Sequence, residues 1–428
     1  MEAAAIVPDP RRWHALALVC VAFFMVGMAI FTLGSLACAL SSSGLALIVF
    51  RAIQGFGGAI VSPATLAIIS AAFRHGGAER NKAFGIWGGV AGSGAAAGVL
   101  LGGVLVEYLG WQWIFLVNVP VGIGIFALAH WLISEGRVEG ADRRVDPAAA
   151  VLVTTGLVSF VYAMSKAPDN GWTSWQTFVF TAIAIVLVGT FLWRELQTDA
   201  PLVPLWIFRL RPVTVANAVG ALLGAAIFGG FFLLTLYMQQ VLGYSPLQAG
   251  VAFLATAGTT IPAAALSQGL VTRFGVKPVM LIGLLLMSFS YFWYTQLPTE
   301  GHFWTNLFLP FFASGFGLAF IFIPLSLAAL SVVEDRIAGI SSGLLNTSQQ
   351  IGGALGVAIM STIATSHTKT LLGDGKSQVE AFSGGYTLPF WVAGSFMLTG
   401  ALITVVMLRN REVPTHAHEP EPVVEPVT

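Results

Sequence analysis

Long runs of apolar residues, separated by short polar segments, follow one another along almost the whole chain. A helix needs about 20 apolar residues to cross the hydrocarbon core of a bilayer. The sequence contains twelve runs of about that length or longer, and the pattern predicts an all-α polytopic membrane protein with about 12 transmembrane helices. The runs are 14–40, 45–72, 83–107, 112–133, 148–166, 176–194, 213–237, 246–271, 278–297, 304–331, 338–364 and 386–408.

Basic residues predict how these spans are oriented, because cytoplasmic segments carry an excess of Lys and Arg. With the N-terminus in the cytoplasm, three basic residues fall in outer loops (Lys166, Lys369 and Lys376) and Arg51 falls inside a span. The other 16 of the 20 Lys and Arg then lie in cytoplasmic segments. The bias predicts that both termini are cytoplasmic and that the chain is a multi-pass protein of the cell (plasma) membrane.

Composition supports a lipid environment and argues against nucleic acid as a partner. Charged residues make up 9% of the chain and hydrophobic residues 56%, whereas a soluble domain carries about 25% charged residues. The formal net charge is zero, so no basic surface is available for a phosphate backbone. The bilayer is therefore the expected surrounding, and the chain is expected to be a monomer.

An internal repeat relates the second and tenth predicted spans. Transporters are often built from repeated halves, and segment 55–70 resembles segment 315–331, each followed by a polar charged loop and a glycine-spaced span. The matching positions, at offsets of 260 and then 261, are Gly55, Phe56, Gly57, Ala59, Pro63, Ala67 and Ser70.

The two halves differ in length. Three predicted spans precede the repeated segment in the second half, but one precedes it in the first, a deficit of about 61 residues or two spans. The 27-residue first run is interpreted as a join between two ancestral helices. The expected organisation is an incomplete N-terminal bundle of about four spans (1–133), two linker spans and a cytoplasmic connector (134–212), a six-helix bundle (213–411) and a disordered cytoplasmic tail (412–428).

Five motifs extend the repeat argument to a family. The chain resembles the major facilitator superfamily, specifically its fourteen-span drug:proton antiporter branch, over nearly all of its length. The motifs that carry the resemblance are Phe50-Arg-Ala-Ile-Gln-Gly-Phe-Gly-Gly-Ala59, Trp87-Gly-Gly-Val-Ala-Gly-Ser-Gly-Ala-Ala-Ala-Gly-Val-Leu-Leu-Gly-Gly103, Gly110-Trp-Gln-Trp-Ile-Phe-Leu-Val-Asn-Val-Pro-Val-Gly122, Gly243-Tyr-Ser-Pro-Leu-Gln-Ala-Gly250 and Asn346-Thr-Ser-Gln-Gln-Ile-Gly-Gly353.

The chain also departs from the family pattern. It passes from Ala22–Val26, which resembles the family's first span, directly to Ile30–Cys38, which resembles the third. The proline usual in the antiporter motif is replaced by Val99. The resemblance implies a secondary transporter that exports small amphipathic drugs or metabolites, coupled to protons, by alternating access. The alternatives are a non-transporting truncated remnant of such a transporter, and a membrane scaffold or sensor.

Arg51 is the leading candidate for a coupling or gating residue, because a charge inside a membrane costs at least ~2.5 kcal/mol and requires compensation. Gln54, one turn further along, is a candidate partner, with Gly55 beside it. Glycines at every fourth position let a neighbouring helix approach closely, and the resemblance implies a gate-sealing interface. These glycines are Gly94, Gly98 and Gly102.

Polar amides within the predicted spans are candidates for contact with a substrate, or for hydrogen bonds between helices. They are Asn118, Asn346, Gln349 and Gln350. No Asp or Glu lies in the middle of a predicted span, so the sequence names no intramembrane proton carrier. No metal-ligand cluster, phosphate-binding loop or nucleophile–base pair occurs at usable spacing. The sequence therefore predicts no cofactor, no metal and no enzymatic activity.

Overall fold

The computed structural model describes residues 12–72, 98, 100–132, 146–171, 173–198, 201–330, 332–333 and 335–409. These residues fold into helices joined by short connections, and no strand occurs among them. The chain divides into two units, each described here by itself. Unit 1 comprises Met1–Arg143 and Pro246–Val251, and unit 2 comprises Arg144–Ser245 and Ala252–Thr428.

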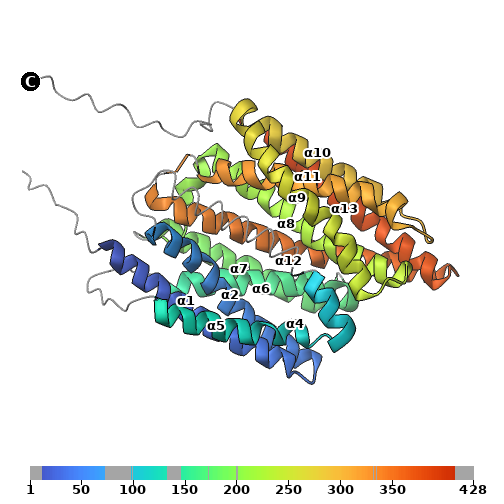
Figure 1. Cartoon of the computed structure of the whole chain (residues 1–428), viewed down its shortest axis with the longest axis horizontal. Coiled ribbons are helices and arrows are strands. Elements are labelled where there is room, and N and C mark those ends of the chain that lie inside the picture. The colour runs from blue at the N-terminus through green and yellow to red at the C-terminus, as the bar shows by residue number, and fades with distance from the viewer. Residues whose placement is uncertain are drawn as a thin grey trace, which may run out of the picture. The chain divides into compact units, whose positions relative to one another are not determined.

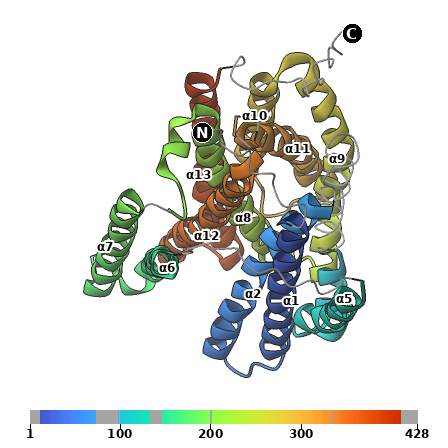
Figure 2. The same cartoon turned by 90° about the vertical axis from the view of Figure 1, so that its left-hand side faces the viewer.

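Unit 1 is organised around the first helix of the chain. Helix α1 (Arg12–Ala39) packs along α2 (Gly44–Ala72) and also contacts α4 and α5 (Figures 1 and 2). Within the described part of this unit, the chain continues with the helices Leu100–Leu109, α4 (Trp113–Leu116) and α5 (Asn118–Leu132). The last two together cover the single span predicted at 112–133.

Unit 2 contains the longer helices. Helix α8 packs against α11, α12 and α13, while α10 packs against α11 and α13. Helices α6 and α7 form a pair, and α6 also contacts α12 (Figure 2). The elements are α6 (Pro147–Asn170), α7 (Trp175–Gln197), η1 (Leu205–Arg209), α8 (Arg211–Leu236), η2 (Tyr237–Val241), α9 (Pro246–Phe274, in unit 2 from Ala252 onward), α10 (Val276–Tyr294), η3 (Phe303–Leu307), α11 (Phe308–Leu330), α12 (Asp335–Gly373) and α13 (Gln378–Met407).

The helices account for the predicted spans. Within the described residues, 8 helices are long and apolar enough to cross a membrane. Three shorter apolar helices coincide with the first, third and fourth predicted spans, although Leu100–Leu109 ends two residues after the third. The long, more polar α12 covers the eleventh predicted span, at 338–364. The prediction of an all-α membrane fold is confirmed. Gly94 and the predicted tail at 412–428 lie outside the described residues.

One predicted loop is wrong. The polar, glycine-containing stretch 365–385 separates the last two predicted spans and carries Lys369 and Lys376, so it is predicted as an outer loop. Instead, α12 continues to Gly373 and α13 already begins at Gln378. Ser377 caps α13 by accepting a hydrogen bond from the Glu380 backbone, and the Glu380 carboxylate accepts one from the Ser377 backbone. A helix of 39 residues is about 58 Å long, nearly twice the hydrocarbon thickness of about 30 Å. The C-terminal end of α12 is therefore helical although its residues are polar. A search for apolar runs does not detect such a segment.

Two helix pairs, one in each unit, cross through the same arrangement of glycines. In unit 1, a Cβ added to Gly27 would lie 3.0 Å from the Gly57 carbonyl oxygen, and one added to Gly57 would lie 2.8 Å from the Gly27 carbonyl oxygen. In unit 2 the reciprocal pair is Gly283 and Gly317, at 2.9 and 3.0 Å. Because each glycine admits the backbone of the other helix, α1–α2 and α10–α11 are built on the same contact.

The correspondence between the two units extends to α5 in unit 1 and α13 in unit 2. Gly57 and Gly317 differ by 260 positions, and Gly27 and Gly283 by 256. Counting the same 256 positions from Thr32 gives Ser288. A Cβ on Gly122 of α5 would lie 2.0 Å from the Thr32 hydroxyl, and the Ser288 hydroxyl donates to the carbonyl of Gly394 in α13, at 3.1 Å. Within unit 1, residues from Gly27 onward therefore take the place that α10 takes within unit 2.

Candidate functional site

A chain of polar side chains links α2 to α1 at the predicted position of Arg51. The Arg51 guanidinium donates through Nη1 to the Gln54 side-chain oxygen, one turn along α2. Gln54 in turn donates through Nε2 to the Ser35 hydroxyl of α1, at 2.5 Å. Gln54 is 2% exposed and Ser35 is fully buried. The structure thus brings together the two predicted residues Arg51 and Gln54, and it adds Ser35, which the sequence did not single out.

Glycine makes this close approach possible. A Cβ on Gly34 of α1 would lie 2.8 Å from the Gln54 Cα, so a larger residue there would push α2 away. The short separation lets the Gln54 amide reach Ser35 inside the helix interface. A buried amide requires a partner because leaving it unpaired costs about 1–3 kcal/mol. Gln54 therefore joins the two helices and holds one edge of the Arg51 guanidinium.

Arg51 itself lies at the surface of unit 1, beside an aromatic side chain. Its guanidinium carbon is 5.6 Å from the centre of the Phe115 ring, a cation–π distance. Phe115 in turn meets Trp111 edge to face, with ring centres 6.2 Å apart. Among the described residues no carboxylate forms an ion pair with Arg51. Its neighbours are an amide and a ring, and both leave the positive charge in place.

The predicted glycines have open surroundings where they are described. A Cβ added to Gly55, Gly98 or Gly102 would meet no atom within 4 Å. The neighbouring Gly103 is different, because a Cβ there would lie 2.9 Å from the Pro246 carbonyl oxygen. The gate-sealing role of the glycine face stays a prediction.

The predicted amides have different surroundings. Asn118 donates back to the Ile114 carbonyl at 3.2 Å, so this amide is used at the junction of α4 and α5. Asn346 and Gln350 of α12 are exposed, and Gln349 is half-buried. No hydrogen bond to the side chains of these three α12 residues occurs within the described part of the chain. Their amides are thus available to a ligand or to water.

Close packing between α8 and α12 was missed at the sequence level. A Cβ on Gly224 would lie 2.1 Å from the Gln349 carbonyl oxygen, and Cβ atoms on Gly352 and Gly356 would lie 2.0 and 2.2 Å from carbonyl oxygens of α8. The signal was present, because Gly220 and Gly224, like Gly352 and Gly356, are four residues apart.

A hydrogen bond reinforces this packing. The Ser348 hydroxyl of α12 donates to the Asn217 side-chain oxygen of α8, at 2.8 Å. Asn217 is buried and also donates to the Val213 carbonyl within its own helix. The segment that carries Asn346, Gln349 and Gln350 is therefore held against α8.

An ion pair joins the ends of α6 and α7. Arg194 Nε lies 2.5 Å from a carboxylate oxygen of Asp146, which also caps α6 by accepting from the backbone of Ala148 and Ala149. The Arg194 hydrogen bond, together with these backbone hydrogen bonds, holds the pKa of Asp146 below its usual value. Arg194 therefore has a carboxylate partner, which Arg51 lacks among the described residues.

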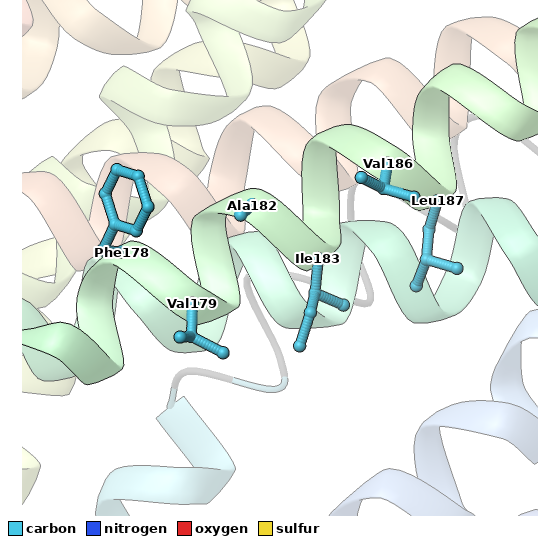
Figure 3. Close-up of a pocket in the computed structure, with 6 residues that line it drawn as sticks. All are labelled: Phe178, Val179, Ala182, Ile183, Val186 and Leu187. Atoms are coloured by element: carbon cyan, nitrogen blue, oxygen red, sulfur yellow. The ribbon is translucent and has the colours of Figure 1, made fainter.

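A shallow apolar groove runs along α7. Figure 3 shows that all of its lining side chains come from this single helix, and none of them is polar. The residues are Phe178, Val179, Ala182, Ile183, Val186 and Leu187. The groove contains none of the predicted site residues and offers no group that could orient a polar ligand.

Comparison with known proteins identifies relatives across most of the chain. A family model described as Major Facilitator Superfamily matches residues 20–357 and 260–426. The Tetracenomycin C resistance and export protein of Streptomyces glaucescens is 34% identical over 352 residues, which cover 82% of this chain and 65% of that protein. The chain therefore spans less than two thirds of that relative's length.

Other relatives align over more of the chain. The Puromycin resistance protein pur8 of Streptomyces alboniger is 33% identical over 395 residues, 91% of this chain and 78% of that protein. The crystal structure of an auto-inhibited POT family peptide transporter superposes with a TM-score of 0.60 at 14% identity, covering 94% of this chain and 86% of that one. At that identity the superposition shows a shared fold.

Proposed function

Because the chain belongs to the Major Facilitator Superfamily, we propose that it is a secondary transporter that exports small amphipathic drugs or metabolites by alternating access, coupled to protons. It acts as a monomer in the plasma membrane, with both termini in the cytoplasm. The proposal draws on relatives named for resistance to tetracenomycin C and puromycin and, in the first case, for export. It requires no cofactor.

The observation that carries the proposal is the repeated glycine crossing of α1–α2 and α10–α11. Alternating access works by moving one repeat against another around a binding site, so it needs two related halves. Gly27 with Gly57, and Gly283 with Gly317, make the same reciprocal contact in two units of one chain. This relation supports a moving transporter better than a static scaffold, which has no need of paired halves.

In this proposal Arg51 is the coupling residue. An arginine that is held by Gln54 but carries no ion pair among the described residues can respond to the arrival or departure of a negative charge. Asn346, Gln349 and Gln350 are the amides of unit 2 that we propose as substrate contacts, and Asn118 is the corresponding candidate of unit 1, considered by itself. We assign Gly55, Gly94, Gly98 and Gly102 to helix faces that close against a neighbouring helix in another state of the transport cycle.

The experiment is transport by the purified full-length chain in proteoliposomes. With an imposed proton gradient, adding drug should produce proton flux, measured with a pH-sensitive dye. Arg51→Ala should reduce that flux at least about 10-fold, because the coupling charge is lost. The matched control is Arg273→Ala, which removes another arginine beside an aromatic ring, that of Phe274. Flux that is absent in the wild type, or unchanged in Arg51→Ala, would contradict the proposal or the role of Arg51.

A second candidate is a related protein without transport activity. In unit 2, α8 packs against the glycines of α12, whereas a Cβ added to Gly98 or Gly102 in unit 1 meets no described atom within 4 Å. Among the described residues of unit 1, α1 takes the place of α10, and no helix takes the place of α8. Proteoliposomes that bind drug but move neither drug nor protons would favour this candidate.

A further inference from the structure

The guanidinium of Arg51 is accessible at the surface of unit 1. Arg51 is exposed, and the hydrogen bond to Gln54 uses one of its terminal nitrogens. Because Gln54 is itself anchored to buried Ser35, the guanidinium is held at one edge, and its other donors have no acceptor among the described residues. A guanidinium has five N–H donors, and two of them on one edge can donate parallel hydrogen bonds to the two oxygens of a carboxylate. The geometry therefore preorganises Arg51 to accept a planar anion.

The apolar surroundings of Arg51 favour binding of a group that neutralises its charge. Ile48, one turn before Arg51 on the same face of α2, is apolar and exposed. A charge in such surroundings is costly unless it is paired. Gln54 and Phe115 bind the guanidinium without cancelling its charge, and no carboxylate of the described chain does so. A ligand that brings its own negative charge removes this cost, whereas a cationic ligand adds a like charge.

The aromatic side chains define the rest of the ligand. Phe115 lies beside the guanidinium, and Trp111 meets Phe115 edge to face while remaining exposed. Trp113 and Ile114 extend the same exposed apolar segment. Aromatic rings on a protein attract other aromatic rings in offset or edge-to-face arrangements. A flat aromatic body joined to an acid group would contact both parts of this surface.

We propose that Arg51, Gln54, Phe115 and Trp111 form a recognition site for aromatic organic acids, with the carboxylate on Arg51 and the ring system against Phe115 and Trp111. This proposal rests on the proposed function in one respect, because it takes the bound acid to be a transported substrate. It narrows the broad class of amphipathic compounds to anionic aromatic ones.

The test is direct binding to the purified full-length chain in nanodiscs, by equilibrium dialysis with labelled probes. Three probes share one ring system and differ in charge: naphthoate, naphthamide and naphthylmethylammonium. Naphthoate should bind at least about 10-fold more tightly than naphthamide, the value of one charge-assisted hydrogen-bonded pair. Naphthylmethylammonium should bind more weakly than either. Equal affinity for the acid and the amide in the wild type would overturn the proposal.

Variants locate the site. Arg51→Gln should abolish the preference for the acid, and Arg51→Lys should retain part of it because the charge remains but the fork is lost. Arg273→Gln, which removes an arginine 5.2 Å from the Phe274 ring, should leave the preference unchanged. If Arg51→Gln does not fold, Phe115→Leu provides a second test and should weaken all three probes by a similar factor. A preference that survives in Arg51→Gln, or affinities unaffected by Phe115→Leu, would overturn the assignment.

Transport in proteoliposomes separates this inference from the proposed function. Arg51-dependent binding of naphthoate with no movement of any compound would leave the site assigned and contradict the transporter. Export of neutral or cationic dyes by both the wild type and Arg51→Gln, without selective binding of naphthoate, would leave the transporter intact and contradict the site.

Discussion

The α1–α2 and α10–α11 pairs share a backbone contact but differ in the side chains beside it. In both pairs, two glycines let each helix approach the carbonyl of the other. The position equivalent to Arg51 at the 260 offset is Phe311, and the position equivalent to Gln54 is Ser314. Where unit 1 carries a polar chain ending in an exposed cation, unit 2 carries a buried phenylalanine.

The surroundings of Phe311 complete the contrast. Its ring centre lies 5.2 Å from that of Phe253 and 6.0 Å from that of Tyr294. Tyr291, the counterpart of Ser35 at the 256 offset, donates to the Ala226 carbonyl rather than to α11. The comparison teaches that small residues at the crossing fix how the helices pack, while the positions around it remain free to acquire charge in one unit and aromatic packing in the other.

The largest expected effect comes from making unit 2 resemble unit 1. Phe311→Arg would place a charge where the native side chain is 1% exposed and enclosed by aromatic rings. Burial of an unpaired charge should destabilise the chain by about 4 kcal/mol or more, seen as aggregation in size-exclusion chromatography or a large drop in Tm. Phe311→Leu should remain folded. A monodisperse Phe311→Arg with a wild-type Tm would show that the aromatic cluster is not a tightly packed core.

The next effect tests whether the two glycine crossings are equally rigid. A Cβ on Gly57 would lie 2.4 Å from the Phe31 backbone nitrogen, whereas one on Gly317 would first meet the Met287 side chain, at 2.7 Å. Methionine is flexible and backbone is not. Gly57→Ala should therefore cost about 3 kcal/mol and Gly317→Ala about 1 kcal/mol, within the range for overpacking.

Thermal unfolding in detergent measures this difference. Gly55→Ala is the matched control on α2, since a Cβ there meets nothing within 4 Å. It should leave Tm unchanged or slightly raised because alanine favours helix. A Gly57→Ala variant as stable as Gly55→Ala would mean that α1 and α2 are not pressed together at this glycine.

A smaller effect is expected from the polar chain. Gln54→Leu would remove the hydrogen bonds to Arg51 and Ser35, at a cost of about 1 kcal/mol, as for hydrogen bonds between membrane helices. Ser314→Ala in unit 2 should cost less, because the Ser314 hydroxyl donates within its own helix to the Phe311 carbonyl at 2.8 Å, and its contact with the Thr256 hydroxyl of α9 is longer, at 3.3 Å. Tm and drug-dependent proton flux should be measured together. If Ser314→Ala reduced flux more than Gln54→Leu, the polar chain would not be the coupled element.

The smallest effect concerns an arginine that does have a carboxylate. Arg194 holds the pKa of Asp146 below its usual value, so the pair contributes stability above the unfolded pKa and loses it as pH falls through the lower folded value. Asp146→Asn should remove this pH dependence and lower Tm slightly at neutral pH. Unfolding curves of the two proteins should converge at low pH. Curves that stay equally separated at every pH would contradict the ionic origin of the effect.

The sequence determined most of the fold and part of the site. Whether a segment can cross the bilayer depends on its own apolar residues, so the helices around Leu223 and Leu284 could be located from about 20 consecutive residues. The repeat was visible for the same reason, since Gly57 and Gly317 lie in similar local sequences. Arg51 and Gln54 could be paired because they are one helical turn apart. The helical end of α12 was missed because its residues are not apolar.

Tertiary structure alone decided which distant residues meet. Ser35 is 19 residues from Gln54, and Phe115 is 64 residues from Arg51, so no local pattern could assign them to one site. The same holds for Ser348 and Asn217, which are 131 residues apart. Hydrophobicity places a segment in the membrane, but it does not choose the segment's neighbour. That choice depends on where glycines let two backbones approach and on which polar groups they then bring within hydrogen-bonding distance.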